Sequence, residues 1–112
     1  MIGYVTLGTN DLERAAKFYD AIAAELGTAR MMEWPGAIAW GTPGGGAGIG
    51  LTRPFDGQAA SVGNGVMVAL DAPNPAEVDR LHAPEAKPFH GIVFEGNSPC
   101  AKVQVRLFGK LA

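Results

Sequence analysis

The sequence predicts an α+β fold made of two βαβββ-like halves, the second one strand short. Three observations support this. The chain opens with a short apolar stretch and one well-patterned helix, turn-forming residues then separate three further strand-like stretches, and the strand-then-helix order returns after residue 63. The same architecture at half the chain length indicates an internal repeat. The predicted units cover residues 1–58 and 64–112, within one domain spanning 1–112.

The first helix is predicted from its apolar periodicity and its end signals. Its apolar stripe comprises Leu12, Ala15, Ala16, Tyr19, Ile22, Ala23 and Leu26. Asn10 is the expected N-cap, with Glu13 three residues later as in a capping box, and Gly27 stands where a glycine often ends a helix. One face of the preceding strand, Ile2 to Leu7, must cover the stripe, so the other face is free to line something else.

Three more strands complete the predicted first half. They are expected at residues 29–34, 37–41 and 47–52. Trp34, just before Pro35, is expected to be a strand-end or interface residue. Gly48 and Gly50 inside a strand indicate a bulge or a close approach by another group. Residues 54–65 have turn composition without periodicity and are the predicted linker.

The second half repeats the pattern in shortened form. Its strands are predicted at residues 66–70, 89–95 and 101–108. A short helix should begin at Asn74 as N-cap, with Pro75 and Glu77 in its first turn, and end before Pro84. An incomplete second half leaves an unpaired sheet edge, which proteins usually cover, so a homodimer is expected.

The composition limits the kinds of partner that the protein is expected to bind. The chain has 47% hydrophobic and 18% charged residues and a formal net charge of −2, which fits a globular protein. The sequence has no Lys/Arg cluster of the kind that binds nucleic acid, so no nucleic-acid partner is predicted. No apolar run approaches the ~20 residues of a membrane span, so no membrane partner is predicted either. The chain start is expected to be a strand and not a secretory leader. The single Cys100 favours a reducing cytoplasm.

Several stretches resemble one superfamily. They are the DLxxAxxFY run at Asp11 to Tyr19, AIAWG at residues 37–41, GLTRPFDGQ at 50–58 and GNGVMVAL at 63–70. In these the chain resembles the vicinal-oxygen-chelate proteins, which include glyoxalases, bleomycin-resistance proteins and extradiol dioxygenases. The resemblance covers about the first 80 residues and fades beyond His82. It implies paired βαβββ units that form a cup-shaped mixed sheet with helices outside.

Metal-dependent members of that superfamily hold a divalent ion in the cup through His and Glu side chains. The resemblance aligns three of those ligand positions with Tyr4, Gly50 and Met67. A phenol is an uncommon ligand, glycine has no side chain, and a thioether is too soft for the usual ions. No metal and no other cofactor is therefore predicted, and whether the chain is an enzyme stays open.

Strand alternation and the resemblance together predict a ligand site on the concave face. The predicted ligand-binding residues are Tyr4, Thr6, Trp40, Arg53 and Met67. An aromatic wall with few charges suits an apolar or aromatic ligand. The alternative for the apolar residues is plain core, and for Arg53 it is a solvated turn residue paired with Asp56.

Three functions follow from these observations. The leading hypothesis is a metal-independent small-molecule-binding protein of the glyoxalase/bleomycin-resistance type. The alternative is a metal-dependent glyoxalase-like lyase or isomerase whose ion is held by other residues, such as His90 and Glu95. The second alternative is a non-catalytic assembly module, which predicts no pocket.

Overall fold

The computed structural model describes residues 1–61, 68–81, 92–95 and 102–105. The chain forms two compact units, and the boundary between them falls between Ser61 and Val62. Each unit is described by itself below.

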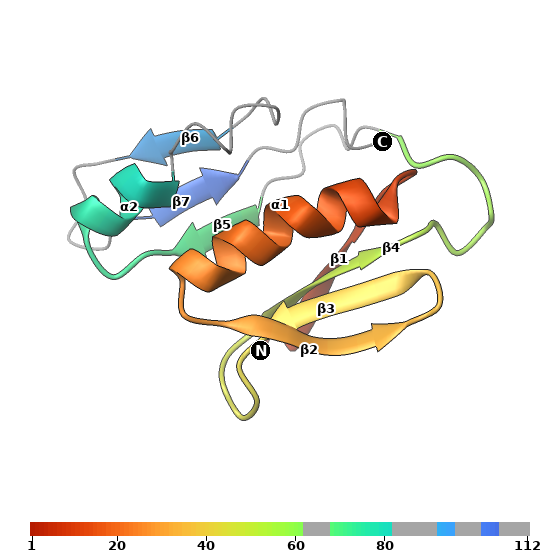
Figure 1. Ribbon diagram of the computed structural model, residues 1–112, viewed down its shortest axis with the longest axis horizontal. Helices are drawn as coiled ribbons and strands as arrows, with labels where there is room; N and C mark the ends of the chain where they lie inside the picture. The colour runs from red at the N-terminus through yellow and green to blue at the C-terminus, as the bar shows by residue number, and fades with distance from the viewer. Residues whose placement is uncertain (62–67, 82–91, 96–101, 106–112) are drawn as a thin grey trace. The chain divides into compact units, whose positions relative to one another are not determined.

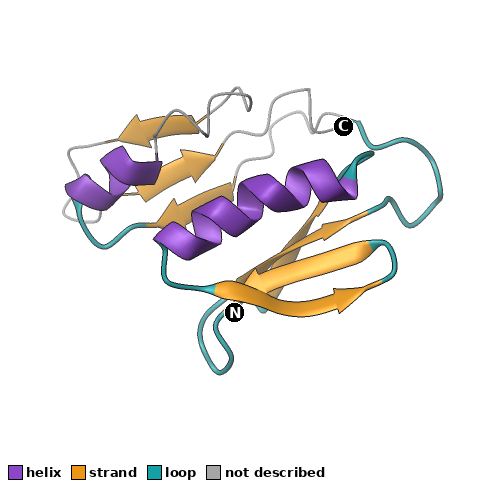
Figure 2. Cartoon of the chain, in the orientation of Figure 1, coloured by secondary structure: helices purple, strands orange, loops and turns teal. Residues whose placement is uncertain are grey.

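The first unit has the predicted βαβββ order. Its elements are β1 (Tyr4–Gly8), α1 (Leu12–Glu25), β2 (Ala29–Trp34), β3 (Ala37–Gly41) and β4 (Gly48–Thr52). The strands form one mixed sheet in the order β1-β4-β3-β2, in which β1 runs parallel to β4 and the other pairs are antiparallel. The sheet is curved, and α1 lies across one of its faces (Figures 1 and 2).

The second unit is shorter, as the sequence predicted. It contains β5 (Val68–Asp71), α2 (Pro75–Leu81), β6 (Ile92–Glu95) and β7 (Lys102–Val105), with an antiparallel sheet in the order β5-β7-β6. The predicted N-cap is confirmed, because the Asn74 side-chain oxygen accepts from the Glu77 backbone N–H at 2.9 Å. The predicted stop at Pro84 lies outside the described residues. The α+β class with a three-stranded second unit is confirmed for the described residues.

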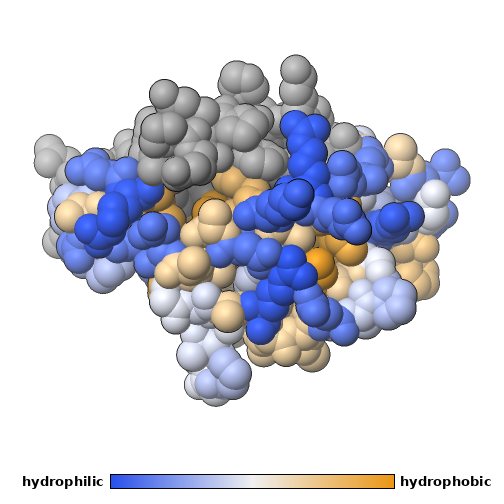
Figure 3. Space-filling view, viewed as in Figure 1, coloured by the Kyte–Doolittle hydropathy of each residue, from blue (hydrophilic) through white to orange (hydrophobic). Residues whose placement is uncertain are grey.

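Helix α1 buries the predicted stripe against the sheet. The buried residues are Ala15, Ala16, Phe18, Tyr19, Ile22 and Ala23. Phe18 was not expected, and Leu12 and Leu26 at the two ends are only partly buried. The sheet meets this stripe with Ile38, Trp40 and Leu51. The side of α1 that faces away from the sheet is largely hydrophilic (Figure 3).

The start of α1 differs from the prediction by one residue. Asp11, not Asn10, is the N-cap, and its carboxylate accepts from the Arg14 backbone N–H at 3.1 Å. The prediction was wrong because two adjacent residues are both good caps. The Asn10 amide instead binds the backbone of Ala60 twice, donating at 3.1 Å and accepting at 2.7 Å. It thereby ties the segment after β4 to the start of the helix.

The end of α1 follows the prediction. Gly27 has a φ of 72°, a left-handed conformation that favours glycine. The Thr28 N–H donates to Ala23 at 2.8 Å and the Gly27 N–H to Ala24 at 3.2 Å, which is the Schellman pattern. No helix in the described part of the chain is long and apolar enough to cross a membrane.

Candidate functional site

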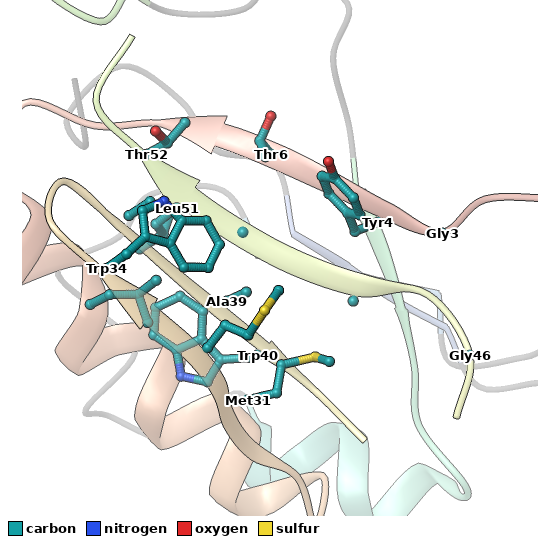
Figure 4. A pocket seen from close by; sticks show the side chains of 15 residues that line it. Gly3, Tyr4, Thr6, Met31, Trp34, Ala39, Trp40, Gly46, Leu51 and Thr52 are labelled. Atoms are coloured by element: carbon teal, nitrogen blue, oxygen red, sulfur yellow. The ribbon is translucent and has the colours of Figure 1, made fainter. Parts of the chain in front are cut away.

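A groove of about 270 Å³ lies on the face of the first sheet that α1 leaves uncovered. Its floor consists of small residues on the two central strands, Ala39 on β3 and Gly48 and Gly50 on β4. One wall, from the edge strand β1, carries Tyr4 and Thr6. The opposite wall, from the edge strand β2, carries Met31, Met32 and Trp34 (Figure 4). The two edge strands therefore form walls on either side of a floor whose residues have little or no side chain.

Strand register explains why these residues share a face. Thr6, Gly50, Ala39 and Met32 follow one another across the four strands as paired residues. Paired residues on neighbouring strands project to the same side of a sheet. Since the two middle members of this row are glycine and alanine, the outer two rise above the floor between them.

The glycines of β3 and β4 permit close approaches, as the sequence indicated. A Cβ on Gly48 would lie 2.8 Å from the Trp40 carbonyl oxygen. A Cβ on Gly41 would lie 2.8 Å from the Met31 sulfur, and one on Gly50 3.2 Å from the Thr6 methyl group. Side chains at these positions would collide with the floor or fill the groove, so the groove depends on glycine there.

A bulge does occur in the sheet, but it lies in β2 and not in β4, whose glycines show the close approach instead. Arg30 pairs with Trp40 and Met32 with Ala39, so Met31 is an extra residue between two consecutive positions of β3. A bulge changes the direction of side chains on one side of it. As a result, Met31 and Met32 both line the groove although they are adjacent in the chain.

Arg30, before the bulge, belongs to the opposite face. Its guanidinium donates to the two carboxylate oxygens of Asp20 on α1 at 2.8 and 2.7 Å and also pairs with Glu33. It lies 5.8 Å from the centre of the Trp40 ring, whose indole N–H donates to Asp20 at 2.8 Å. The hydrogen bond from Arg30, aided by that from Trp40, lowers the pKa of Asp20 despite partial burial. This network joins α1 to β2 and β3.

Among the described residues, none that lines the groove carries a charged side chain. Its polar groups are the hydroxyls of Tyr4, Thr6 and Thr52 and the indole N–H of Trp34. The hydroxyl of Thr52 donates to the Arg53 carbonyl at 2.9 Å. The large wall residues are exposed to solvent, since Tyr4 is 73% and Trp34 50% exposed. Such a lining suits an apolar ring with at most a neutral polar substituent.

The five residues that the sequence predicted for the site do not all line the groove. Tyr4 and Thr6 line the groove. Trp40 contributes to the lining, but its indole is only 4% exposed and lies 5.6 Å from the Tyr19 ring of α1, so the side chain supports the sheet from behind. Arg53 is not part of the lining, and its backbone N–H donates to Gly36 at 3.0 Å. Met67 lies outside the described residues.

Sequence reasoning missed the whole β2 wall. Trp34 and Met32 share one face by alternation, and this signal was readable from the sequence. Met31 could not be assigned, because the bulge that turns it toward the groove has no local signature. Thr52 was also missed, although it follows Gly50 on the same face of β4.

The described residues do not fit the divalent ion that the superfamily implies. Tyr4 faces the groove, Gly50 offers no donor, and Met67 lies outside the described residues. The groove supplies hydroxyls, thioethers and an indole, whereas hard and borderline ions need carboxylates or imidazoles. Within the described ranges, no three His, Cys, Asp or Glu side chains gather to hold a metal.

The βαβββ unit with its open groove, followed by a shorter unit of the same kind, is the architecture of a vicinal-oxygen-chelate protein. No family model matches the sequence, and no curated protein matches it. A solved structure does: a glyoxalase/bleomycin resistance protein from Albidiferax ferrireducens T118 has a TM-score of 0.72 and 30% sequence identity. The match covers 88% of this chain and 78% of that one. The chain belongs to the glyoxalase/bleomycin resistance protein family.

Proposed function

We propose that the protein is a metal-independent small-molecule-binding member of its family that holds an apolar or aromatic ligand in the groove. The observation that supports this most directly is the lining that the described residues form, which is uncharged and has aromatic and thioether walls above a floor of glycine and alanine. Gly48 and Gly50 leave the β4 floor without side chains, so a flat molecule lies close to the sheet between Tyr4 and Trp34.

The binding strength follows from the surface that such a ligand covers. A bicyclic ring that removes about 250 Å² of apolar surface from water, counting both partners, gains roughly 6 kcal/mol at ~25 cal/mol per Å². Association costs several kcal/mol of translational and side-chain freedom. A simple ring fragment is therefore expected to bind weakly, with a Kd on the order of 0.1–1 mM.

The two alternative functions have less support. The lyase or isomerase hypothesis needs a metal held by residues such as His90 and Glu95. His90 lies outside the described residues, and Glu95 is the last residue of β6, where it pairs with Lys102 on β7. The assembly-module hypothesis predicted no pocket, so the groove favours the binding hypothesis over it.

We also propose a homodimer, in a reducing compartment such as the cytoplasm. Within the described residues, the sheet of the first unit ends in the edge strands β1 and β2, and sheet edges are usually covered. A sedimentation coefficient that rises with protein concentration is expected. A monomer at every concentration would exclude the dimer. The single Cys100 supports the compartment, because it has no partner within the chain for a disulfide.

A thermal-shift experiment with 2-naphthol tests the binding function. The probe should raise the melting temperature of the wild type in proportion to its concentration. Trp34→Ala removes the aromatic residue of the β2 wall and should abolish the shift. Phe55→Ala is the matched control, because Phe55 is a fully exposed aromatic residue outside the groove, and its shift should equal that of the wild type.

A metal arm in the same experiment separates the proposal from the lyase hypothesis. Zn²⁺, Mn²⁺, Ni²⁺ or Co²⁺ should leave the melting temperature unchanged, and so should EDTA. Stabilisation by one of these ions, reversed by EDTA, would contradict metal independence. The lyase hypothesis would then replace the proposed function.

A further inference from the structure

We infer that the groove selects uncharged ring ligands, and that the β2 bulge, held by the pairing of Arg30 with Asp20, is what keeps charge out of it. This inference rests on the proposed function. It adds the charge class of the ligand and the residues outside the groove that determine it.

The first step is the side-chain direction along β2. Trp34 and Met32 pair with Ala37 and Ala39 on the groove face. Strict alternation would continue this face to Arg30 and would turn Met31 toward α1. The bulge at Met31 reverses both positions, so Arg30 pairs with the buried Trp40 and Met31 lines the groove. A shift of one residue therefore decides whether a thioether or a guanidinium stands in the wall.

The second step is what holds that register. On the α1 face, Arg30 meets the carboxylates of Asp20 and Glu33 and the face of the Trp40 ring. On the groove face, the described part of the lining offers it no carboxylate. Charge-assisted, two-pronged hydrogen bonds to a carboxylate are the strongest that a guanidinium makes. The difference in partners between the two faces favours the bulged register, so Asp20 and Glu33 act as positioning residues for the groove.

The third step is the consequence for the ligand. A charged group in the groove would lose water and meet no opposite charge among the described lining residues, which is costly. A hydroxyl or carbonyl substituent can instead be hydrogen-bonded by Tyr4 or Thr6. The ligand class is thus a neutral, flat ring system with few polar substituents.

Three probes with one ring system test the selectivity at neutral pH: 2-naphthol, 2-naphthoate and 2-naphthylmethylammonium. Binding is followed by the NMR signals of the two indole N–H groups. The Trp34 signal should move more than that of Trp40, which is buried and bonded to Asp20. The neutral probe is expected to bind about tenfold or more tightly than either charged probe.

A double variant tests the role of the pairing. Asp20→Asn with Glu33→Gln removes both negative charges from around Arg30 and keeps side-chain size and hydrogen-bond acceptors. Part of the population should then adopt the unbulged register, so naphthoate should bind about tenfold more tightly than in the wild type and 2-naphthol more weakly. The matched control adds Arg30→Gln to the double variant, which should remove the gain for naphthoate.

A single variant in the wall keeps the inference testable if the double variant does not fold. Met32→Lys leaves the bulge and the Asp20–Arg30 pair in place and puts an ammonium directly into the groove. It should reverse the preference from 2-naphthol to naphthoate, and an unchanged preference would show that the lining charge does not set selectivity.

The outcomes separate the inference from the function beneath it. If no probe moves the Trp34 signal, the proposed binding function fails and the inference with it. If all three probes bind equally well, binding stands and the charge selectivity is overturned. If the double variant folds and keeps the wild-type preference, the positioning role of Asp20 and Glu33 is overturned.

Discussion

The two faces of the first sheet are made from the same four strands and have opposite chemistry. On the face that α1 covers, Leu51 is 2% and Trp40 4% exposed. On the open face, Tyr4 is 73% and Trp34 50% exposed, although both are large aromatic residues. Because side chains alternate along each strand, neighbouring residues belong to different faces. The covered face therefore supplies stability, and the open face is available for binding.

The charges are divided between the faces in the same way. Asp20, Arg30 and Glu33 gather on the side of the sheet that meets α1, and the described residues that line the groove carry no charge. This is the reverse of the usual arrangement, in which the solvent-facing side of a sheet is the polar one. An exposed apolar face indicates a surface that binds a ligand or a partner.

The largest expected effect comes from deleting volume on the covered face. Leu51→Ala should lower the free energy of unfolding by about 3 kcal/mol, because it leaves a cavity under α1. Met32→Ala on the open face should cost less than about 1 kcal/mol, since Met32 is already 52% exposed. Urea unfolding measures both. Equal losses would contradict the division of roles between the faces.

The next effect concerns the floor itself. Gly48→Ala should cost about 2 kcal/mol, because its Cβ would lie 2.8 Å from the Trp40 carbonyl oxygen and the backbone must shift. Gly46→Ala is the matched control, since no atom lies within 4 Å of its Cβ position. Urea unfolding of the two variants gives the comparison. A Gly48 variant as stable as the Gly46 variant would show that the floor tolerates side chains.

Much of the fold was predictable because its signals are local. The strands at residues 29–34 and 37–41 were predicted with their observed bounds, since Gly27 and the Pro35-Gly36 pair delimit them. The helix stripe followed from periodicity alone. The N-cap was misplaced by one residue because Asn10 and Asp11 are both suitable, and only the contact of Asn10 with Ala60 distinguishes them.

The site was less predictable because its decisive signal is not local. Alternation from the first strand correctly pointed Tyr4 and Thr6 away from the helix. The β2 wall depends on a bulge at Met31. The position of the bulge is favoured by the contacts of Arg30 with Asp20, ten residues earlier, and with Trp40, on the next strand. No pattern within β2 carries that information. Trp40, the expected aromatic wall, lies behind the sheet because it shares a face of β3 with the buried Ile38, whereas Trp34 pairs with Ala37 on the groove face and takes that place.

A smaller effect tests the ion pair on the covered side. Asp20→Asn should cost about 1 kcal/mol at neutral pH, since both partners are more than a third exposed and solvent screens them. Arg30 lowers the pKa of Asp20 in the folded state, so this stabilisation is complete above the unfolded value of ~3.9 and is lost as the pH falls through the lower folded value.

A double-mutant cycle with Arg30→Gln isolates the pair in urea unfolding. The coupling between residues 20 and 30 should be constant from neutral pH down to about pH 5 and should shrink as the pH falls below the unfolded value and through the lower folded one. A coupling that is unchanged in acid would show that the carboxylate charge does not hold Arg30 on the covered face.

The smallest expected effect on stability concerns the buried hydroxyl of Tyr19, which packs on the covered face. Tyr19 is buried under the sheet, burial raises the pKa of its phenol, and its hydroxyl has no hydrogen-bond partner among the described residues. An unsatisfied buried hydroxyl costs free energy, so Tyr19→Phe should change the stability by no more than about 0.5 kcal/mol, toward greater stability. Urea unfolding provides the number. A loss of about 1 kcal/mol or more would mean that the hydroxyl is hydrogen-bonded in solution. The covered face would then contain a second polar anchor besides Asp20, and its stability would rest less on apolar packing than the contrast with the open face implies.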